Sequence, residues 1–561
     1  MPQEIILPPK YYLDYFRFLL EFVQRLYGHI LNDDERQFIE IFDQLSEDAQ
    51  CLFVRFSNRS GLFFRTNKIK YEEIADIQDA INELKFNGLL EELDDIHAAH
   101  IDEILNLFTK EEWLKMAPPS ELSLRSLSKP NLVRYLKATF HFKDLVSGLD
   151  LLEPVVKVCA EVEMMMFKFL FFGNRHATMT EFVVRDLGKI NFEHYQDDSY
   201  TARFNNRAEA EQKLMVSLTN ETFYEKQQSV NPPEDIYLWF VSWNASLPIL
   251  SEVAQPSYDR LVCKVALYLE RQKLSEQALD VYQFTDKIPS RERRARLLLR
   301  LGMIDEAKAL CEAMAAEPQN ADERFFAIDF EQKLASKKRT KKSVTQFLHD
   351  AQTITVSIDY RRRVEQGVAD YFTERGYQAV HSENYPWRGL FGLVFWDIIY
   401  DTNVQAIHHP LQRSPSDFYL PDFYIKRQTQ IKQRLAELDT TDKFLANIET
   451  TFIQKFGTAN VMVDWNEVLM VLCQIIIKNL TINQLNVILL EMAQNLRENT
   501  HGFPDLMIWN DNEMELIEVK SPTDHLSAQQ LYWLQLFKRE NIMARVLRVE
   551  WGEAKEVTLN V

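Results

Sequence analysis

The stretch GFPDLMIWNDNEMELIEVK, residues 502–520, alternates polar and apolar residues on both sides of Asp511-Asn512. This pattern predicts a β-hairpin with a tight turn. If the turn is two residues long, Asp505 lies directly opposite Glu518 across the two strands. Because side chains alternate along a strand, Glu518 and Lys520 share one face of the hairpin. We therefore expect two carboxylates and an ammonium group to lie close together.

These charges predict a metal site. Two facing carboxylates repel one another unless a cation lies between them, and a hard divalent ion such as Mg²⁺ prefers oxygen ligands. Beside such an ion, Lys520 could position or help to deprotonate an attacking water and stabilise the charge that grows on phosphorus. The simpler interpretation is a surface hairpin with a cross-strand ion pair.

The residues that follow favour the nuclease interpretation. SPTDHLSAQQLYWL, residues 521–534, predicts a helix with Gln530 and Trp533 one turn apart, and residues 545–549 predict a final strand. Asp followed by Glu-x-Lys on adjacent strands is the signature of the PD-(D/E)XK nuclease superfamily. The whole block resembles a VRR-NUC domain, although Ser521 stands where that family often has Gly. This departure affects the loop after the strand and leaves the catalytic set intact.

The rest of the chain is expected to be mostly helical. It has 561 residues but only 14 Gly and 19 Pro, and this length predicts several domains. Residues 53–61 alternate apolar residues with Arg around a turn, which indicates either a small hairpin packed on helices or a basic DNA-contacting wing. After a probable linker at residues 118–120, residues 122–137 resemble a SAP module, a small DNA-binding helical hairpin, with Ser128 as the helix N-cap.

Residues 217–346 have the pattern of helical hairpins. Two small-residue segments, residues 278–282 and 307–311, predict two successive helix pairs, close to the spacing of tetratricopeptide repeats. Basic residues gather at 291–300 and again at 337–342. Such runs are often solvated faces, but in an acidic chain they are where a polyanion would have to bind.

A second motif lies upstream of the hairpin. HSENYPWRGLFGLVFWDII, residues 381–399, resembles the Fanconi-associated nuclease family, in which a Glu precedes such a helix. Members of this family join a SAP module, tetratricopeptide-like helices and a VRR-NUC domain in the order found here. On the residues alone, a carboxylate at the N-terminus of a helix would be favoured over Glu383 as the additional ligand. Asp397 is expected to be structural, as a capping or pairing residue.

The resemblance implies a fold class and a set of domains. The fold is multidomain, with a mostly α-helical N-terminal two-thirds and a C-terminal α/β PD-(D/E)XK, restriction-endonuclease-like domain. We expect a winged-helix-like helical domain at 1–117, a SAP-containing region at 118–215, tetratricopeptide-like repeats at 216–370 and a nuclease domain at 371–561. The VRR-NUC core is expected at about 455–561.

The resemblance also implies an activity. It is structure-specific cleavage of DNA with a 5′-flap preference, together with 5′–3′ exonuclease activity, in the repair of interstrand crosslinks. Phosphodiesters would be hydrolysed with Mg²⁺ or Mn²⁺. The implied catalytic residues are Asp505, Glu518, Lys520 and Gln530, and the implied metal ligands are Glu383, Asp505, Glu518 and Val519.

The net charge of −19 argues against a protein that coats nucleic acid with its whole surface. Local basic residues remain candidates for DNA contacts by their charge. They are Arg125, Lys129, Arg134 and Lys137 in the SAP-like region, Arg293 in the repeats, and Lys337, Lys338 and Arg339 after them. No base-reading motif is visible, so we expect recognition of DNA shape.

The cysteine pattern and the N-terminus indicate the compartment. The five cysteines lack zinc-site spacing, which predicts a reduced cytosolic environment and no ubiquitin-binding zinc finger of the eukaryotic members. No signal peptide is visible, and charged residues interrupt the apolar run 155–172, which predicts a buried helix and no membrane span. A cytoplasmic bacterial homologue is favoured, or a nuclear protein if the source is eukaryotic.

Two alternatives remain open. Stand-alone VRR-NUC proteins act as dimers on four-way junctions, so a Holliday-junction-type resolving nuclease has the same chemistry. A non-catalytic DNA-binding repair scaffold built on the helical repeats would predict decay of the Asp, Glu and Lys set, which is intact. A restriction-type enzyme would need a target-recognition element. The oligomeric state, a monomer or a DNA-induced dimer, stays open.

Overall fold

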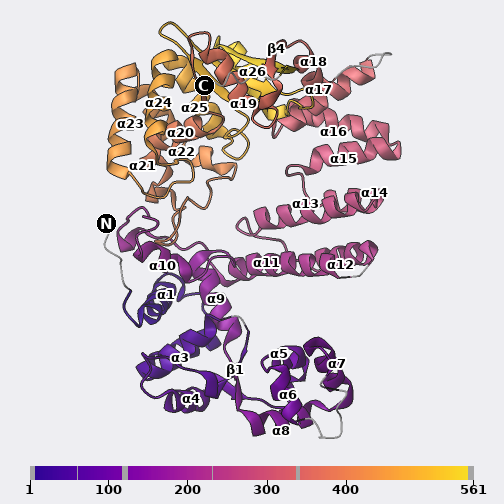
Figure 1. Cartoon of the computed structure of the whole chain (residues 1–561), viewed down its shortest axis with the longest axis vertical. Coiled ribbons are helices and arrows are strands. Elements are labelled where there is room, and N and C mark those ends of the chain that lie inside the picture. The colour runs from indigo at the N-terminus through magenta and orange to yellow at the C-terminus, as the bar shows by residue number, and fades with distance from the viewer. Residues whose placement is uncertain are drawn as a thin grey trace, which may run out of the picture. The chain divides into compact units, whose positions relative to one another are not determined.

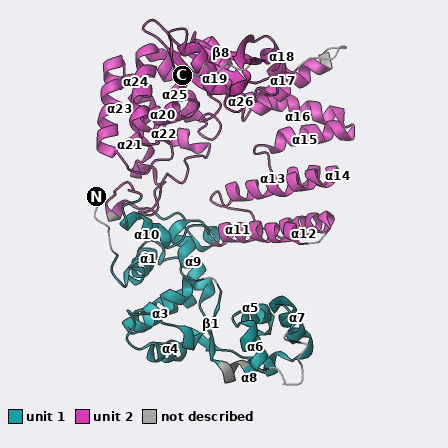
Figure 2. Cartoon of the chain, viewed as in Figure 1, with its two compact units in different colours: residues 1–189, 202–210 teal, residues 190–201, 211–561 magenta. Residues whose placement is uncertain are grey.

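The computed structural model describes residues 7–59, 61–116, 124, 126–229, 232–335 and 342–553. The chain divides into two compact units (Figure 2). Unit 1 comprises residues 1–189 and 202–210, and unit 2 comprises residues 190–201 and 211–561. Each unit has its own sheet, and helices make up most of the remaining elements (Figure 1).

Unit 1 begins with helices around a small three-stranded sheet. The helices are α1 (Tyr11–Tyr27), α2 (Asp33–Gln44), α3 (Glu47–Ser57), α4 (Ile77–Phe86) and, later in the chain, α9 (Glu161–Phe172) and α10 (Thr180–Asp186). The strands β1 (Phe63–Arg65), β2 (Leu90–Glu92) and β3 (Val155–Val158) pair antiparallel in the order β1-β3-β2. The apolar residues of α1 at helical spacing, such as Phe16 and Leu19, are buried as expected.

Two expectations for this unit are wrong in part. Residues 53–57 lie in α3 and not in a hairpin or wing, because Phe53, Val54 and Phe56 are all buried, which the alternation of a half-exposed strand does not allow. The apolar run 155–172 is not one helix. Its β-branched valines form β3 between β1 and β2, and α9 starts only after Ala160, whose φ is +66°.

The SAP-like region is helical as expected. It contains α7 (Lys129–Thr139) and α8 (Phe142–Leu152), and α5 (Ile101–Asn106) and α6 (Lys110–Met116) precede it. Ser128 occupies the N-cap position of α7 with extended backbone, although its hydroxyl makes no capping hydrogen bond. Leu132, Val133 and Leu136 of α7 are buried, so the expected apolar face is present.

Unit 2 contains the helical repeats. They are α11 (Arg207–Gln228, whose first turn lies in unit 1), α12 (Pro233–Ala245), α13 (Gln255–Arg271), α14 (Ser275–Tyr282), α15 (Ser290–Leu301), α16 (Ile304–Ala316) and α17 (Ala321–Ala335). The predicted pairs α13–α14 and α15–α16 are present and follow one another (Figure 1). Ala278 and Ala307 are fully buried where the helices cross, because only a small side chain fits there.

The second sheet has the strand order β4-β8-β7-β6-β5. Its strands are β4 (Gln352–Ser357), β5 (Gln378–His381), β6 (Leu506–Trp509), β7 (Met514–Lys520) and β8 (Ala544–Gly552). The predicted hairpin register is confirmed, since Leu506 lies opposite Ile517 and the amide of Asn510 donates to the carbonyl of Glu513 across the two-residue turn. β8 runs parallel to β7 and to β4.

Helices cover the sheet and extend beside it. The apolar face of β6 and β7 packs with α19 (Val364–Thr373), and Val546 of β8 packs with α26 (Ala528–Arg539). The remaining helices of this region are α18 (Ser343–His349), α20 (Tyr385–Val394), α21 (Trp396–Ile399), α22 (Asp422–Glu437), α23 (Thr441–Lys455), α24 (Glu467–Asn479) and α25 (Ile482–Gln494). The predicted fold class, mostly helical with a C-terminal α/β nuclease fold, is confirmed.

Two smaller features concern the expected compartment. All five cysteines are free thiols. Within the described ranges, no helix is both long and apolar enough to cross a bilayer.

Candidate active site

The hairpin β6–β7 brings Asp505, Glu518 and Lys520 together. Asp505 immediately precedes β6, and a side-chain oxygen of Asp505 accepts a hydrogen bond of 2.8 Å from the amide of Val519 on β7. Lys520 Nζ lies 2.7 Å from Glu518 Oε1. Glu518 is 0% exposed and Lys520 8% exposed. The expected cluster of two carboxylates and one ammonium group is therefore present, with Glu518 and Lys520 buried and Asp505 half-buried.

The electrostatics of this cluster are unbalanced. The pKa of Glu518 is raised to about 8, chiefly by burial and also by the neighbouring carboxylate of Asp505, while Lys520 opposes the rise. Burial also raises the pKa of Asp505, against the opposing effects of the Val519 amide and Lys520. In addition, Glu518 Oε2 is buried without a hydrogen-bond partner. One ammonium group does not compensate the buried Glu518 carboxylate and the half-buried Asp505 carboxylate, so the site is suited to a further cation.

Gln530 holds Glu518 from the adjacent helix. Ser527 and Gln530 form a capping box at the start of α26, in which Gln530 Oε1 accepts from the amide of Ser527 at 2.9 Å. This bond fixes the amide group so that Gln530 Nε2 donates to Glu518 Oε1 at 2.5 Å. The side chain thus acts as a cap and as a support for the carboxylate at once.

Glu383 reaches the site through its backbone. β5 pairs with β6 up to His381, opposite Leu506, and the next two amides, of Ser382 and Glu383, both donate to the carbonyl of Asp505 at 2.9 and 3.1 Å. Glu383 has a φ of +39°, a left-handed conformation that is uncommon for a residue other than glycine. Such backbone strain is concentrated at functional sites.

Asn384 fixes the carboxylate of Glu383. Asn384 Nδ2 donates to Glu383 Oε1 at 2.9 Å, and Asn384 Oδ1 accepts from the amide of Phe503 at 3.2 Å. Asn384 therefore ties Glu383 to the segment that leads into Asp505. Glu383 and Asn384 border a cleft of about 590 Å³ that is lined also by Tyr385 and Asp464.

The predicted metal ligands are brought together only in part. Three of them, Asp505, Glu518 and Val519, lie side by side. The carboxylate of Glu383 instead accepts a hydrogen bond from Asn384. Across the portion of the chain that the structure describes, no group of three or more His, Cys, Asp or Glu side chains is arranged to hold a metal. The two carboxylates and the unpartnered Glu518 oxygen fit a divalent cation by their chemistry.

Two further groups were not named from the sequence. Glu365, in the first turn of α19, lies close enough to raise the pKa of Asp505, as Glu383 also does. Glu365 is a carboxylate at the N-terminus of a helix, the kind of residue that the sequence favoured as the additional metal ligand. Its position in the helix that precedes β5 was the signal that the sequence offered. Arg260 of α13 lies close to Arg497, and burial together with Arg497 lowers the pKa of Arg260. Their 237-residue separation gave no local signal.

The predicted DNA-contacting residues of the SAP-like region have local partners. Lys129 Nζ donates to the carbonyl of Asn106 at 2.9 Å, Arg134 to Asn131 Oδ1 at 3.2 Å, and Lys137 pairs with Asp102 at 2.7 Å. Arg125, Lys337, Lys338 and Arg339 lie outside the described residues.

The basic stretch of α15 is neutralised by carboxylates. Arg293 lies 3.6 Å from Glu270. The other arginines of the stretch also have carboxylate partners: Arg291 with Glu323, Arg294 with Asp286, Arg296 with Glu292, and Arg300 with Glu270. Asp397 pairs with Arg434 at 2.6 Å, which confirms its structural role.

Comparisons with known proteins place this geometry in a family context. The family model described as FAN1, HTH domain, matches residues 10–91, and the VRR-NUC domain model matches residues 439–551. The Fanconi-associated nuclease 1 homolog of Pseudomonas aeruginosa is 25% identical over 97% of this chain and 96% of its own length. The homolog of Arabidopsis thaliana is also 25% identical, over 97% of this chain and 67% of its own length.

The fold is similar to that of a solved relative. The crystal structure of paFAN1 bound to 2nt 5′flap DNA with gap has a TM-score of 0.82 and 24% identity, covering 98% of this chain and 99% of that one. The resemblance to Fanconi-associated nucleases that the motifs indicated is confirmed, including similarity to a bacterial relative.

Proposed function

Starting from a chain that resembles Fanconi-associated nucleases over nearly its whole length, we propose that it is a metal-dependent, structure-specific deoxyribonuclease that incises DNA near 5′ flaps. The observation that carries this proposal is the pair of the half-buried Asp505 and the buried Glu518, which faces a single ammonium group and keeps one Glu518 oxygen without a partner. A surface hairpin with a simple ion pair would leave neither carboxylate buried.

The residues divide the chemistry among them. Asp505 and Glu518, with the backbone carbonyl of Val519 and the nearby Glu383, would hold Mg²⁺ or Mn²⁺. When bound, such an ion supplies Lewis-acid activation of water and of the phosphodiester. Lys520 orients the attacking water and stabilises the charge that develops on the phosphate oxygens. Gln530 keeps the Glu518 carboxylate in one orientation.

The substrate class rests on similarity and charge. The relative in the solved complexes is described as bound to 5′ flap DNA with a gap, in two flap lengths. In this chain, Arg260 and Arg497 repel one another, a repulsion that a bound DNA phosphate would relieve. Both lie in unit 2 with the active site. They are stronger candidates for phosphate contacts than Arg293, which already has a carboxylate partner.

Our proposal also includes four more specific properties that the resemblance to the family implies. They are 5′–3′ exonucleolytic digestion, a role in interstrand crosslink repair, action in the bacterial cytoplasm, and binding of branched DNA as a monomer or as a DNA-induced dimer. The junction-resolving nuclease is the second candidate, because it would use the same hairpin.

The test uses purified full-length protein with Mg²⁺ or Mn²⁺ and end-labelled 5′-flap, 3′-flap, four-way and plain duplex DNA. We expect incision of the 5′ flap that disappears in EDTA and in Asp505→Ala. The matched control is Asp511→Ala, in the exposed turn of the same hairpin, which should cleave like the unaltered protein. Preference for the four-way junction would favour the resolving nuclease. Tight binding without cleavage in either metal would favour the non-catalytic scaffold.

A further inference from the structure

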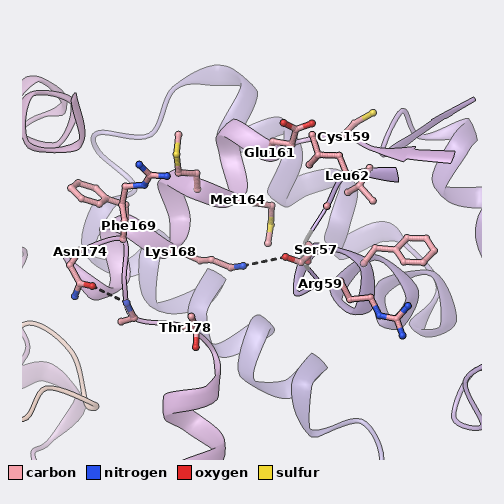
Figure 3. A pocket seen from close by; sticks show the side chains of 16 residues that line it. Ser57, Arg59, Leu62, Cys159, Glu161, Met164, Lys168, Phe169, Asn174 and Thr178 are labelled. Carbon is pink, nitrogen blue, oxygen red and sulfur yellow. Dashed lines mark hydrogen bonds between the residues drawn. The ribbon is translucent and has the colours of Figure 1, made fainter. Parts of the chain in front are cut away.

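A second pocket lies in unit 1, where α3, β1, β3 and α9 meet (Figure 3). Its volume is about 340 Å³, within the range of about 300–1,000 Å³ typical of small-molecule sites. Phe56 of α3 and Met164 and Phe169 of α9 form part of an apolar wall, and Lys168 extends across the cavity. The pocket therefore combines an apolar surface with a central cation, Lys168, and a further cation, Arg175, also lines it.

Lys168 has no good partner for its charge. Its ammonium group reaches only the carbonyl of Ser57 and the side-chain oxygen of Asn58, each at the long distance of 3.4 Å. Among the residues that the structure describes, no carboxylate pairs with Lys168. Glu161, at the rim, is paired instead with Lys157 at 3.5 Å. Burial lowers the pKa of Lys168 below its usual value, and a bound anion would reverse this shift.

The mouth of the pocket also carries a cation. Arg59 is exposed and lies 5.5 Å from the ring centre of Tyr71, and no carboxylate in the described portion pairs with it. In Figure 3, Arg59 extends outward while Lys168 points inward, so the two cations occupy the rim and the interior. This arrangement suits a polyanionic chain that contacts Arg59 at the rim and places one of its monomers inside the pocket.

The apolar wall limits what that monomer is. Phe56 and Phe169 are fully buried and stack on other rings, so they form the base of the wall. Met165 is half-buried and Met164 keeps 6% exposure, so the accessible wall offers adaptable thioether contacts to a planar ring. A nucleotide combines a planar base with a phosphate, which matches an apolar wall beside an ammonium group. A paired nucleotide keeps its base inside the duplex and could not enter.

We propose that this pocket binds a single unpaired nucleotide, with its phosphate on Lys168, its base against Met164 and Met165, and the next phosphate of the strand near Arg59. The proposal rests on the proposed function in one respect, namely that DNA is the polymer presented to unit 1. The FAN1 HTH match over residues 10–91 includes the α3 and β1 side of the pocket. Unit 1 would thereby detect a departure from duplex structure, separately from the nuclease site.

The test measures binding without cleavage. Full-length protein in EDTA is titrated, by fluorescence anisotropy, into a fully paired duplex and into the same duplex with one bulged nucleotide, with dAMP as a competitor. Lys168→Met keeps the length of the side chain and removes its charge. The matched control is Lys157→Met, a half-buried lysine of β3 that does not line the pocket.

We expect the unaltered protein and Lys157→Met to prefer the bulged duplex, and Lys168→Met to lose about tenfold in affinity for it alone, as for loss of a charge-assisted hydrogen bond. Ala177→Phe, which fills the cavity and keeps both cations, should have the same effect as Lys168→Met. Displacement of the bulged duplex by dAMP would show that a free nucleotide also occupies the pocket.

Equal affinity for both duplexes, or equal weakening of both by Lys168→Met, would overturn the proposal. Thermal denaturation of each variant separates a binding defect from loss of folding. Because no metal is present, a failure here is distinct from a failure of the nuclease assay, in which Asp505→Ala is the diagnostic variant.

Discussion

Two regions of the molecule place two carboxylates beside a cation, with opposite results. In unit 1, Arg65 donates to both oxygens of Glu112, at 2.7 and 2.9 Å, and to Glu153 at 2.7 Å. Chiefly through Arg65, the pKa of Glu112 lies far below its usual range. In unit 2, Lys520 contacts Glu518 beside Asp505, and the pKa of Glu518 rises to about 8, chiefly through burial.

The difference comes from the cation and from burial. A guanidinium group presents several donors in a planar fork and can satisfy two carboxylates, whereas an ammonium group is a compact point charge. The Glu112 side chain also keeps 21% exposure, whereas Glu518 has none. In unit 1, Lys68 also lies 3.2 Å from Glu112, so two cations face the two carboxylates, although Glu153 Oε1 is buried without a hydrogen-bond partner. The cluster in unit 2 remains short of positive charge, which is the condition expected of a metal site.

The largest expected effect is that of Glu518→Gln. The substitution removes one of the two carboxylates, so we expect flap cleavage to fall by at least ~10³-fold, the scale seen when a core catalytic group is removed. The metal-free protein should at the same time become more stable, by about 1 kcal/mol or more, because a buried repulsion is lost. Single-turnover cleavage and thermal denaturation in EDTA measure the two effects. A less stable metal-free variant would contradict the comparison.

A smaller effect is expected of Lys520→Arg, which gives the active site the cation that unit 1 uses. The guanidinium fork should bond both carboxylates, stabilise the metal-free protein and compete with the divalent ion. We expect cleavage to fall by roughly 10²-fold, as for loss of one preorganised electrostatic group, with more metal needed for half-maximal rate. Titration of the rate with Mn²⁺ tests this. Lys538→Arg, on the exposed side of α26, is the control.

Asn384→Ala tests the position of Glu383. Loss of the hydrogen bonds to Glu383 and to the Phe503 amide should let the carboxylate move. We expect about a tenfold loss of cleavage at low metal concentration, since groups that orient metal ligands are typically worth about 10–100-fold. Excess Mn²⁺ should restore most of the rate, which a folding defect would not permit. Asn512→Ala, in the hairpin turn, should have no effect.

The smallest expected effect is on stability in unit 1. Glu112→Gln breaks the Arg65 pair and should cost about 1–2 kcal/mol at pH 7, between the values of exposed and buried pairs. Because the pKa of Glu112 is depressed, the contribution of the pair is complete above the ordinary carboxyl value of about 4.3 and is lost as the pH falls through the folded-state pKa. Urea denaturation across this range should show the gap between the two proteins narrowing in acid. A gap independent of pH would contradict the assignment.

Predictions from local sequence patterns are confirmed where interactions between residues close in the chain decide the structure. The register of β6 and β7 follows from alternation and a two-residue turn, so Asp505, Glu518 and Lys520 could be grouped from the sequence. The support from Gln530 was also accessible, because its place in α26 follows from the segment SAQQ after the active-site strand. The roles of these residues in catalysis remain predictions.

Predictions from local patterns are wrong where contacts between residues distant in the chain decide the structure. The sequence of residues 155–158 predicts part of an apolar helix. In the structure these residues pair with β1 and β2 and therefore form a strand. The arginines of α15 form a basic run in the sequence, yet carboxylates from α13, α17 and the connection between α14 and α15 pair with them. The position of a charged residue in the sequence does not show which residue pairs with it in the folded protein.

The hairpin, its register, the acidic and basic groups that it gathers and the mostly helical character of the rest could be predicted from the sequence, because backbone periodicity and turn geometry act over a few residues. Other contacts arise only in the folded chain: Glu383 lies beside Asp505, Asn384 fixes its carboxylate, Arg260 lies near Arg497, and Lys168 crosses a cavity where no described carboxylate pairs with it. These contacts join segments that are far apart in the chain, and they are selected by burial and strand pairing, which no local pattern encodes.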